Sequence, residues 1–196
     1  MIVMYMKWLV LWGWWKKSMI EKYKKDLIKY VNEADSDNIE KVARVIKKVL
    51  VRGNKVFVAG NGGSLATAVH FSEDLLLNND LKSRVILLNN TSILTAISND
   101  FGYESVFVKQ LENLFDQGDL LVTISASGMS QNLINAIDYA NKNGSSVSIS
   151  GFHGGQTKKI ATHTIFVRTE VGSYEETEDL HLVICHMIVK YIKEGQ

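Results

Sequence analysis

Residues 56–74 (VFVAGNGGSLATAVHFSED) constrain the fold more than any other stretch of this chain. The β-branched and aromatic run 56–58 predicts a strand, residues 60–64 predict a tight turn, and the residues after the turn have helical spacing. A strand, a glycine-rich turn and a helix in this order are typical of an α/β protein. In such a unit the N–H groups of the turn and of the helix N-terminus converge on an anion, usually a phosphate.

Short apolar segments alternate with helical segments over the rest of the chain. Strands are predicted at residues 55–59, 84–88, 120–124, 146–150 and 164–167. Helices are predicted at residues 21–34, 37–51, 65–77, 93–97, 104–115, 131–142 and 174–193, with a cap for the second of them at Ser36-Asp37. The alternation predicts a five-stranded parallel sheet covered on both faces, a three-layer αβα sandwich of the α/β class preceded by N-terminal helices. Ligands in that architecture bind at the carboxyl ends of the strands.

The composition is that of an ordinary globular protein. Of 196 residues, 46% are hydrophobic and 22% are charged, which suits one domain with a substantial core. The formal net charge is +1 without a long block of one sign, so no nucleic-acid partner is expected. The single cysteine, Cys185, excludes an intramolecular disulfide and favours a reducing compartment. We therefore expect a cytoplasmic protein.

The first 18 residues differ from the rest of the chain. They are apolar and rich in tryptophan up to Trp15, and two lysines follow. A membrane span needs about 20 apolar residues, and Lys7 interrupts this shorter run, so a span is not expected. Three interpretations stay open: a translation start at Met19, an anchor at a membrane surface, and a packed extra helix. Residues 19–196 are expected to form a single domain.

A second candidate anion site follows the third predicted strand. Residues 125–130 (SASGMS) place three hydroxyls and a glycine at a strand-to-helix junction, where Ser130 can cap the next helix. A well-capped turn without a ligand explains the same pattern. Neither turn has the Gly-Lys-Ser/Thr of a P-loop or the dinucleotide-binding glycine spacing. A phosphate monoester on a small metabolite is the ligand that best suits hydroxyl-rich turns of this kind.

Histidine and carboxylate side chains on two predicted helices form another candidate site. His70 and Asp74 are four residues apart and leave the same helix face. Glu178 and His186 are separated by a rise of about 12 Å and a rotation of about 80° on the last helix. These four side chains could together hold a divalent metal such as zinc, and solvated pairs on helix surfaces are the simpler alternative. His181 points away from that face.

A polar stretch, residues 89–103, follows the second predicted strand and is not expected in the core. Asn99 and Asp100 could accept hydrogen bonds from sugar hydroxyls. A helix-ending turn at Gly102 explains the same residues equally well.

Five motifs, in order and spacing, resemble those of the phosphoheptose isomerases, which are members of the sugar isomerase (SIS) domain superfamily. They are GNGGS at 60–64, HFSED at 70–74, TSILTAISNDFGYE at 91–104, SASGMS at 125–130 and EDLHLVICH at 178–186. The resemblance covers about residues 19–191 and implies the SIS fold. It also implies an aldose–ketose isomerase that converts sedoheptulose 7-phosphate, through an enediol, to D-glycero-D-manno-heptose 7-phosphate. That product supplies heptose for bacterial lipopolysaccharide or capsule.

The resemblance further implies a homotetramer with sites near subunit interfaces, one Zn²⁺ per subunit, and roles for residues at matching positions. Asp74 would be the catalytic base and His186 its acid/base counterpart. The implied substrate-binding residues are Asn61, Gly62, Gly63, Asn99, Asp100, Ser125, Ala126, Ser127, Ser130 and Glu178, with the serines at the phosphate. The implied metal ligands are His70, Asp74, Glu178 and His186.

The chain departs from the family pattern at two of these positions. Asp74 stands where the family has Glu, which shortens the base by one methylene. Glu178 stands where the family has Gln, which adds a negative charge, and Glu175 and Glu176 precede it where the family tends to carry a basic residue. Two alternatives therefore stay open: an isomerase for a different phosphosugar, and a non-catalytic phosphosugar-binding tetrameric module.

Overall fold

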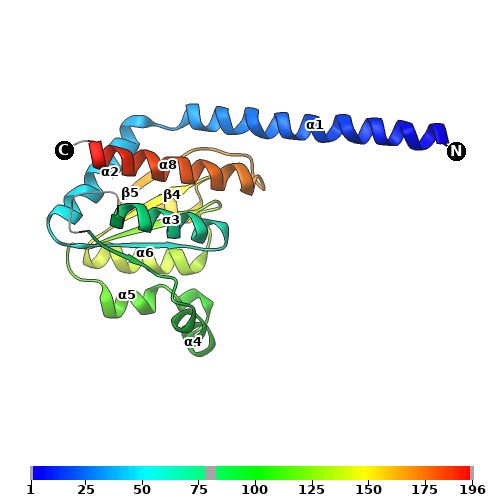
Figure 1. Cartoon of the computed structure of the whole chain (residues 1–196). Coiled ribbons are helices and arrows are strands. Elements are labelled where there is room, and N and C mark those ends of the chain that lie inside the picture. Colours follow the sequence, from blue (N-terminus) through cyan, green and yellow to red (C-terminus); the bar gives the residue numbers. More distant parts are fainter. Residues whose placement is uncertain (1, 78–82, 195–196) are drawn as a thin grey trace.

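The computed structural model describes residues 2–77 and 83–194, with side chains described from residue 18 onward. Five parallel strands form one sheet in the order β2-β1-β3-β4-β5 (Figure 1). Their bounds are β1 Lys55–Gly60, β2 Arg84–Leu87, β3 Leu120–Ser125, β4 Ser145–Ser150 and β5 His163–Phe166. The five predicted strands are confirmed to within one residue at each end. The α/β class and the parallel sheet are confirmed with them.

Helices cover both faces of the sheet (Figure 1). One layer contains α2 (Ser36–Val51), α3 (Gly63–Leu77) and α8 (Tyr174–Glu194), and the C-terminal part of α1 (Ile2–Glu33) packs against α8. The other contains α4 (Thr91–Phe101), the 3₁₀ helix η1 (Tyr103–Ser105), α5 (Val108–Leu114), α6 (Gln131–Asn143) and α7 (Gly155–Ile160). The expected three-layer sandwich is therefore present.

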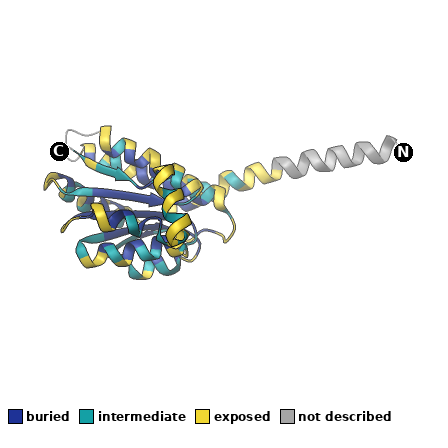
Figure 2. Ribbon diagram, turned by 90° about the horizontal axis from the view of Figure 1, so that it is seen from below, coloured by how far each residue is buried: buried dark blue, intermediate teal, exposed yellow. Residues whose placement is uncertain are grey.

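The period of two along each strand explains the two cores. Val56 and Val58 of β1 pack in the core beneath α2, α3 and α8, whereas Phe57 and Ala59 pack in the core beneath α5 and α6. All residues of β3 are buried, as Figure 2 shows for the centre of the sheet. A strand buried on both faces reads as a continuous apolar run, which is why the sequence predicted β3 so well.

Several helical details differ from the sequence-based expectation. Helix α1 begins at residue 2 and not at residue 21, and α4 spans Thr91–Phe101 where only residues 93–97 were predicted. The predicted helix 104–115 is divided into η1 and α5, because the chain bends to bury Val106 and Phe107. Helix α7 was not predicted, since its six residues carry little apolar periodicity. The cap of α2 is Asp35, whose carboxylate accepts a hydrogen bond from the backbone N–H of Asn38 at 3.1 Å, and not Ser36-Asp37.

The C-terminal part of α1 contacts α8 and the segment before it. The hydroxyl of Tyr23 donates a hydrogen bond to Asp179, and the backbone N–H of Glu170 donates one to the hydroxyl of Tyr30 at 3.1 Å. The side chains of residues 1–17 lie outside the described part of the structure, so the interpretations of the extension 1–18 stay predictions. Among the described residues, no helix is both long and apolar enough to span a membrane.

Candidate active site

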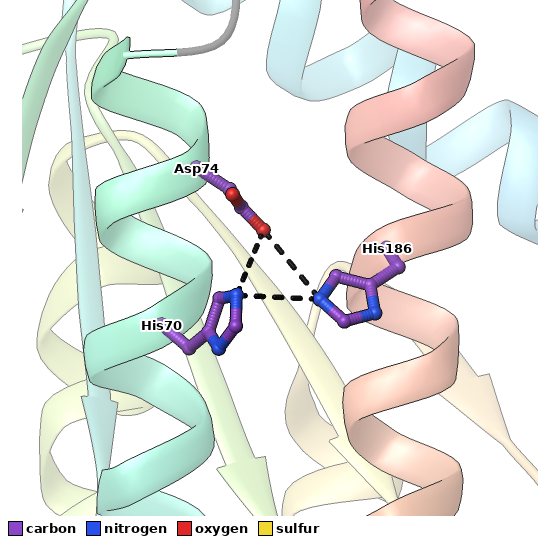
Figure 3. A group of neighbouring side chains, drawn as sticks. All are labelled: His70, Asp74 and His186. Carbon is purple, nitrogen blue, oxygen red and sulfur yellow. Dashed lines mark hydrogen bonds and ion pairs between the residues drawn. The ribbon is translucent and has the colours of Figure 1, made fainter.

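Two histidines and one aspartate meet between α3 and α8 (Figure 3). The Nε2 atoms of His70 and His186 lie 3.4 Å apart, and they lie 3.5 and 3.6 Å from the Oδ2 atom of Asp74. The histidine side chains are half exposed, whereas Asp74 is 17% exposed. The predicted pair His70 and Asp74 on one face of α3 is thus joined by His186, which lies 116 positions after His70.

The spacing of these three atoms fits a tetrahedral metal ion. Zinc binds imidazole nitrogen and carboxylate oxygen at about 2.0–2.2 Å, so ligand atoms at the corners of a tetrahedron lie about 3.3–3.6 Å apart. The three observed distances fall in that range. Two imidazoles and a carboxylate are also a donor set that suits zinc.

Glu178 does not lie with this group. Its carboxylate packs against Gly63 at the start of α3, where a Cβ atom on residue 63 would overlap it. The eight residues between Glu178 and His186 correspond to about 12 Å of helix rise, and the side chains do not bridge it here. Burial raises the pKa of the Glu178 carboxyl, and the negative charges of Glu175 and Asp179 raise it further. Glu178 therefore lies beside the glycine-rich turn, and its role as a metal ligand stays a prediction.

The serine-rich turn lies at the carboxyl end of β3 and leads into α6. The Ser125 hydroxyl accepts a hydrogen bond from the backbone N–H of Gly128 at 3.0 Å, and the Ser127 hydroxyl accepts one from Met129 at 3.3 Å. Ser130 occupies the expected N-cap position, but its side chain makes no capping hydrogen bond. An N-cap hydroxyl and free N–H groups at a helix start are groups that can bind a phosphate.

Close packing fixes the shape of this turn. Gly128 has a φ of 64°, and a Cβ atom there would overlap the carbonyl oxygen of Gly154. The Gly128 carbonyl accepts a hydrogen bond from the backbone N–H of Thr157 at 3.0 Å. The turn is therefore held by α7, the helix that the sequence pattern did not reveal.

A cavity of about 400 Å³ opens between the two predicted anion-binding turns. Its lining residues are Asn61, Tyr103, Glu104, Ser130, Gln131 and Asn132. Asn61 and Ser130 were predicted as substrate-binding residues, whereas the other four were not. Tyr103 and Glu104 lie at the end of the TSILTAISNDFGYE motif, which was the signal that could have pointed to them.

The remaining predicted residues lie in three different places. Gly62 and Gly63 are in the turn beside Asn61, and Ala126 is buried in the serine-rich turn. Asn99 and Asp100 are exposed on the last turn of α4, where the Asn99 amide donates a hydrogen bond to the Asp100 carboxylate at 2.8 Å. Neither of these two side chains lines the cavity of the described chain.

The group formed by His70, Asp74 and His186 and the cavity lie in different parts of the domain. Asp74 lies eleven residues beyond Gly63, which is about 16 Å of helix rise from the glycine-rich turn. His70 and His186 are half exposed on the outer surface between α3 and α8. Within one chain, the His70, Asp74 and His186 group therefore lies well away from the glycine-rich turn.

Two buried side chains of α8, His181 and Cys185, are not expected to be reactive. Burial lowers the pKa of His181 to about 4. Burial also raises the pKa of the Cys185 thiol, and the charge of Asp74 adds to that shift. Both side chains are fully buried in the core, so neither is a candidate nucleophile or metal ligand.

These features define the class of the protein. It is a SIS-domain protein, since the model of the SIS domain family matches residues 21–149. A phosphoheptose isomerase of Akkermansia muciniphila is 37% identical over 161 residues, which cover 80% of this chain and 84% of that protein. A probable phosphoheptose isomerase of Thermoplasma acidophilum is 39% identical over 166 residues, which cover 80% and 90% of the two chains.

Solved structures give the same result. A phosphoheptose isomerase from Francisella tularensis superposes with a TM-score of 0.81 at 27% identity, covering 91% of this chain and 96% of that one. The phosphoheptose isomerase from Neisseria gonorrhoeae also superposes with a TM-score of 0.81 at 27% identity, covering 90% and 99%. The chain belongs to the phosphoheptose isomerase family.

Proposed function

We propose that this protein is an aldose–ketose isomerase that converts sedoheptulose 7-phosphate to D-glycero-D-manno-heptose 7-phosphate. The observation that carries the proposal is the convergence of His70, Asp74 and His186, because it joins a carboxylate base, two imidazoles and a metal-type donor set at one point. Family membership supplies the class of substrate.

The serine-rich turn is the proposed phosphate site. Ser125, Ala126 and Ser127 form the turn, and Ser130 with the first residues of α6 lines the neighbouring cavity. Asn61, Gly62 and Gly63 are the proposed contacts to the sugar, since glycines let the backbone approach a ligand closely. Asn99, Asp100 and Glu178 are proposed as further contacts to sugar hydroxyls.

The proposed reaction is a proton transfer between neighbouring carbons. Asp74 takes a proton from C1 of the ketose while His186 gives one to the C2 oxygen, which yields a 1,2-enediol. Asp74 then returns the proton to C2 as His186 takes the O1 proton, so the aldehyde forms at C1 and both side chains return to their starting states. No atom is gained or lost in this sequence. A base needs reach to the carbon, so the short side chain of Asp74 makes its position critical.

One zinc ion per subunit is proposed at His70, Asp74 and His186, with Glu178 as the family-implied fourth ligand. A bound zinc would act as a Lewis acid that polarises the substrate oxygen. Within the chain itself, the Nε2 atoms of both imidazoles lie 3.5–3.6 Å from the Asp74 carboxylate.

We further propose a homotetramer with active sites near subunit interfaces, in the cytoplasm, supplying heptose for lipopolysaccharide or capsule. The separation of the cavity from the His70 group within one chain supports a site completed by a neighbouring subunit. Residues 19–196 are proposed as a single SIS domain, and the family match begins close to that start, at residue 21. A chain starting at Met19 should then unfold at the same temperature as the full chain.

Two alternatives follow from the Asp74 and Glu178 substitutions: another phosphosugar as substrate, or a module that binds a phosphosugar without turnover. Proton exchange at C1 and C2 in deuterated water separates all three. The zinc-loaded protein should exchange these protons on sedoheptulose 7-phosphate, Asp74→Asn should abolish the exchange, and Glu73→Gln, an exposed neighbour, should not. Exchange only on another ketose phosphate supports the second substrate. Phosphosugar binding without any exchange refutes the enzyme.

A further inference from the structure

A hydrogen-bond network joins three chain segments at the mouth of the cavity. The amides of Asn61 and Asn132 donate to each other's carbonyl oxygens, both at 3.0 Å. The hydroxyl of Tyr103 donates to the Oδ1 atom of Asn61 at 2.9 Å. Asn132 is 2% exposed, whereas Tyr103 is 58% exposed. The network thereby ties the turn after β1 to η1 and to the first turn of α6.

A backbone group favours one direction for the bonds of this network. The N–H of Leu133 is shared between the carbonyl oxygen of Ser130 at 3.1 Å and the Oδ1 atom of Asn132 at 2.9 Å, and a backbone N–H can only donate. A flipped Asn132 amide would place its NH₂ group against this N–H, so the Asn132 oxygen faces Leu133 and its NH₂ group faces the carbonyl oxygen of Asn61. That fixes the Asn61 amide in turn, so Tyr103 acts as a donor and not as an acceptor.

The fixed orientation limits what Asn61 can offer to a ligand. Its carbonyl oxygen has two lone pairs, and Tyr103 and Asn132 occupy both. Its NH₂ group uses one hydrogen for Asn132 and keeps the other. Toward the cavity, Asn61 is thus a hydrogen-bond donor only, and a ligand group beside it must be an oxygen acceptor, such as a carbonyl or a hydroxyl oxygen.

We infer that Tyr103 and Asn132 are positioning residues that hold Asn61 as a donor at a fixed distance from the serine-rich turn. Asn132 is two residues beyond Ser130, so the same short segment carries the phosphate end and the sugar end of the site. The network then selects ligands by the separation between their phosphate and their acceptor oxygen. This inference rests on the proposed function for the identity of the phosphosugar.

Calorimetric binding of sedoheptulose 7-phosphate and of inorganic phosphate tests the inference. Tyr103→Phe removes one hydrogen bond to Asn61 and should weaken sedoheptulose 7-phosphate binding about fivefold, whereas Asn132→Ala removes two and should weaken it about tenfold. Binding of inorganic phosphate should change less than about twofold, because the Ser125 to Gly128 bond is untouched. The control Tyr139→Phe removes a hydroxyl from α6 outside the network and should bind both ligands as the unaltered chain does.

A double-mutant cycle shows whether Tyr103 acts through Asn61. In an Asn61→Ala background, Tyr103→Phe should have no additional effect on sedoheptulose 7-phosphate binding. The Asn61 side-chain amide signals in an NMR spectrum should also shift in Tyr103→Phe, without any ligand. Tyr103 is exposed, so this variant is expected to fold even if Asn132→Ala does not.

Equal losses for both ligands, additive effects in the cycle, or unchanged binding in Tyr103→Phe would each overturn the inference. A protein that shows the expected binding pattern but no proton exchange leaves the inference intact and refutes the proposed isomerase. If the protein exchanges protons but its affinities for both ligands are the same in every variant as in the unaltered chain, the proposed isomerase stands and the inference is refuted.

Discussion

The rings of His70 and His186 meet edge to face between α3 and α8, with centroids 5.0 Å apart and planes inclined by 71°. Their Nε2 atoms point at the same carboxylate oxygen of Asp74 (Figure 3). Two imidazole nitrogens directed at one carboxylate oxygen form an arrangement that a bound cation stabilises, because all three atoms can donate lone pairs to it.

Removing one imidazole should therefore weaken metal binding. We expect His186→Ala to lose at least about 100-fold in zinc affinity, since one of the three converging ligands is gone. Titration against a competing chelator measures the affinity without any substrate. His153→Ala, which removes an exposed histidine from the loop after β4, should retain the unaltered affinity. Equal zinc affinity in both variants would contradict the proposed site.

Lengthening the proposed base tests the substrate. Asp74→Glu restores the methylene that the family pattern carries, and a displacement near 1 Å changes rates by about 100-fold. We expect kcat for sedoheptulose 7-phosphate to rise about tenfold or more, with little change in KM. A lower rate on this substrate, together with a lost rate on another ketose phosphate, would mean that the site is built for the shorter base.

The contact between Gly63 and Glu178 predicts that the Glu178 side chain can move. In Gly63→Ala the new Cβ atom would overlap the Glu178 carboxylate, which is the far end of a flexible side chain and must turn away from the glycine-rich turn. The free energy of unfolding should then change by less than about 0.5 kcal/mol, because the side chain shifts and the backbone does not. Denaturant unfolding measures this free energy. A clear loss in Gly63→Ala that Gly63→Ala/Glu178→Ala recovers would show instead that the Glu178 carboxylate is fixed in place.

The buried His181 side chain should lower the free energy of unfolding in mild acid. Its pKa is about 4 in the folded chain and about 6.5 in the unfolded chain, so the unfolded state binds more protons between these values. The contribution of the neutral His181 side chain to the free energy of unfolding is complete above pH 6.5. As the pH falls from 6.5 toward 4, the free energy of unfolding decreases by on the order of 3 kcal/mol.

The variant His181→Leu isolates this effect. Both ring nitrogens of His181 are buried without a hydrogen-bond partner in the described structure, so the apolar replacement should cost little at pH 7. Its free energy of unfolding should depend less on pH between 6.5 and 4 than that of the unaltered chain. Burial lowers the pKa of His163 as well, which leaves a residual slope of the same sign in both proteins. Identical slopes would contradict the prediction.

The sequence by itself determined the layers of this protein. Strands such as β3 are buried on both faces and read as apolar runs, and α3 follows a glycine-rich turn that its sequence spells out. The pairing of His70 with Asp74 was also local, because four residues along a helix place two side chains on one face. The family motifs then identified His186 as their partner across 116 positions.

Only the tertiary structure decided which distant side chains meet. The packing of α3 against α8 places His186 beside His70 and Glu178 beside Gly63. Helical spacing alone does not determine these contacts. The Tyr103, Asn132 and Asn61 network likewise joins three segments whose approach depends on the packing of η1 against α6. Local periodicity fixes which face a residue occupies, but the distance between faces is set by how whole elements pack, and no short stretch of sequence carries that information.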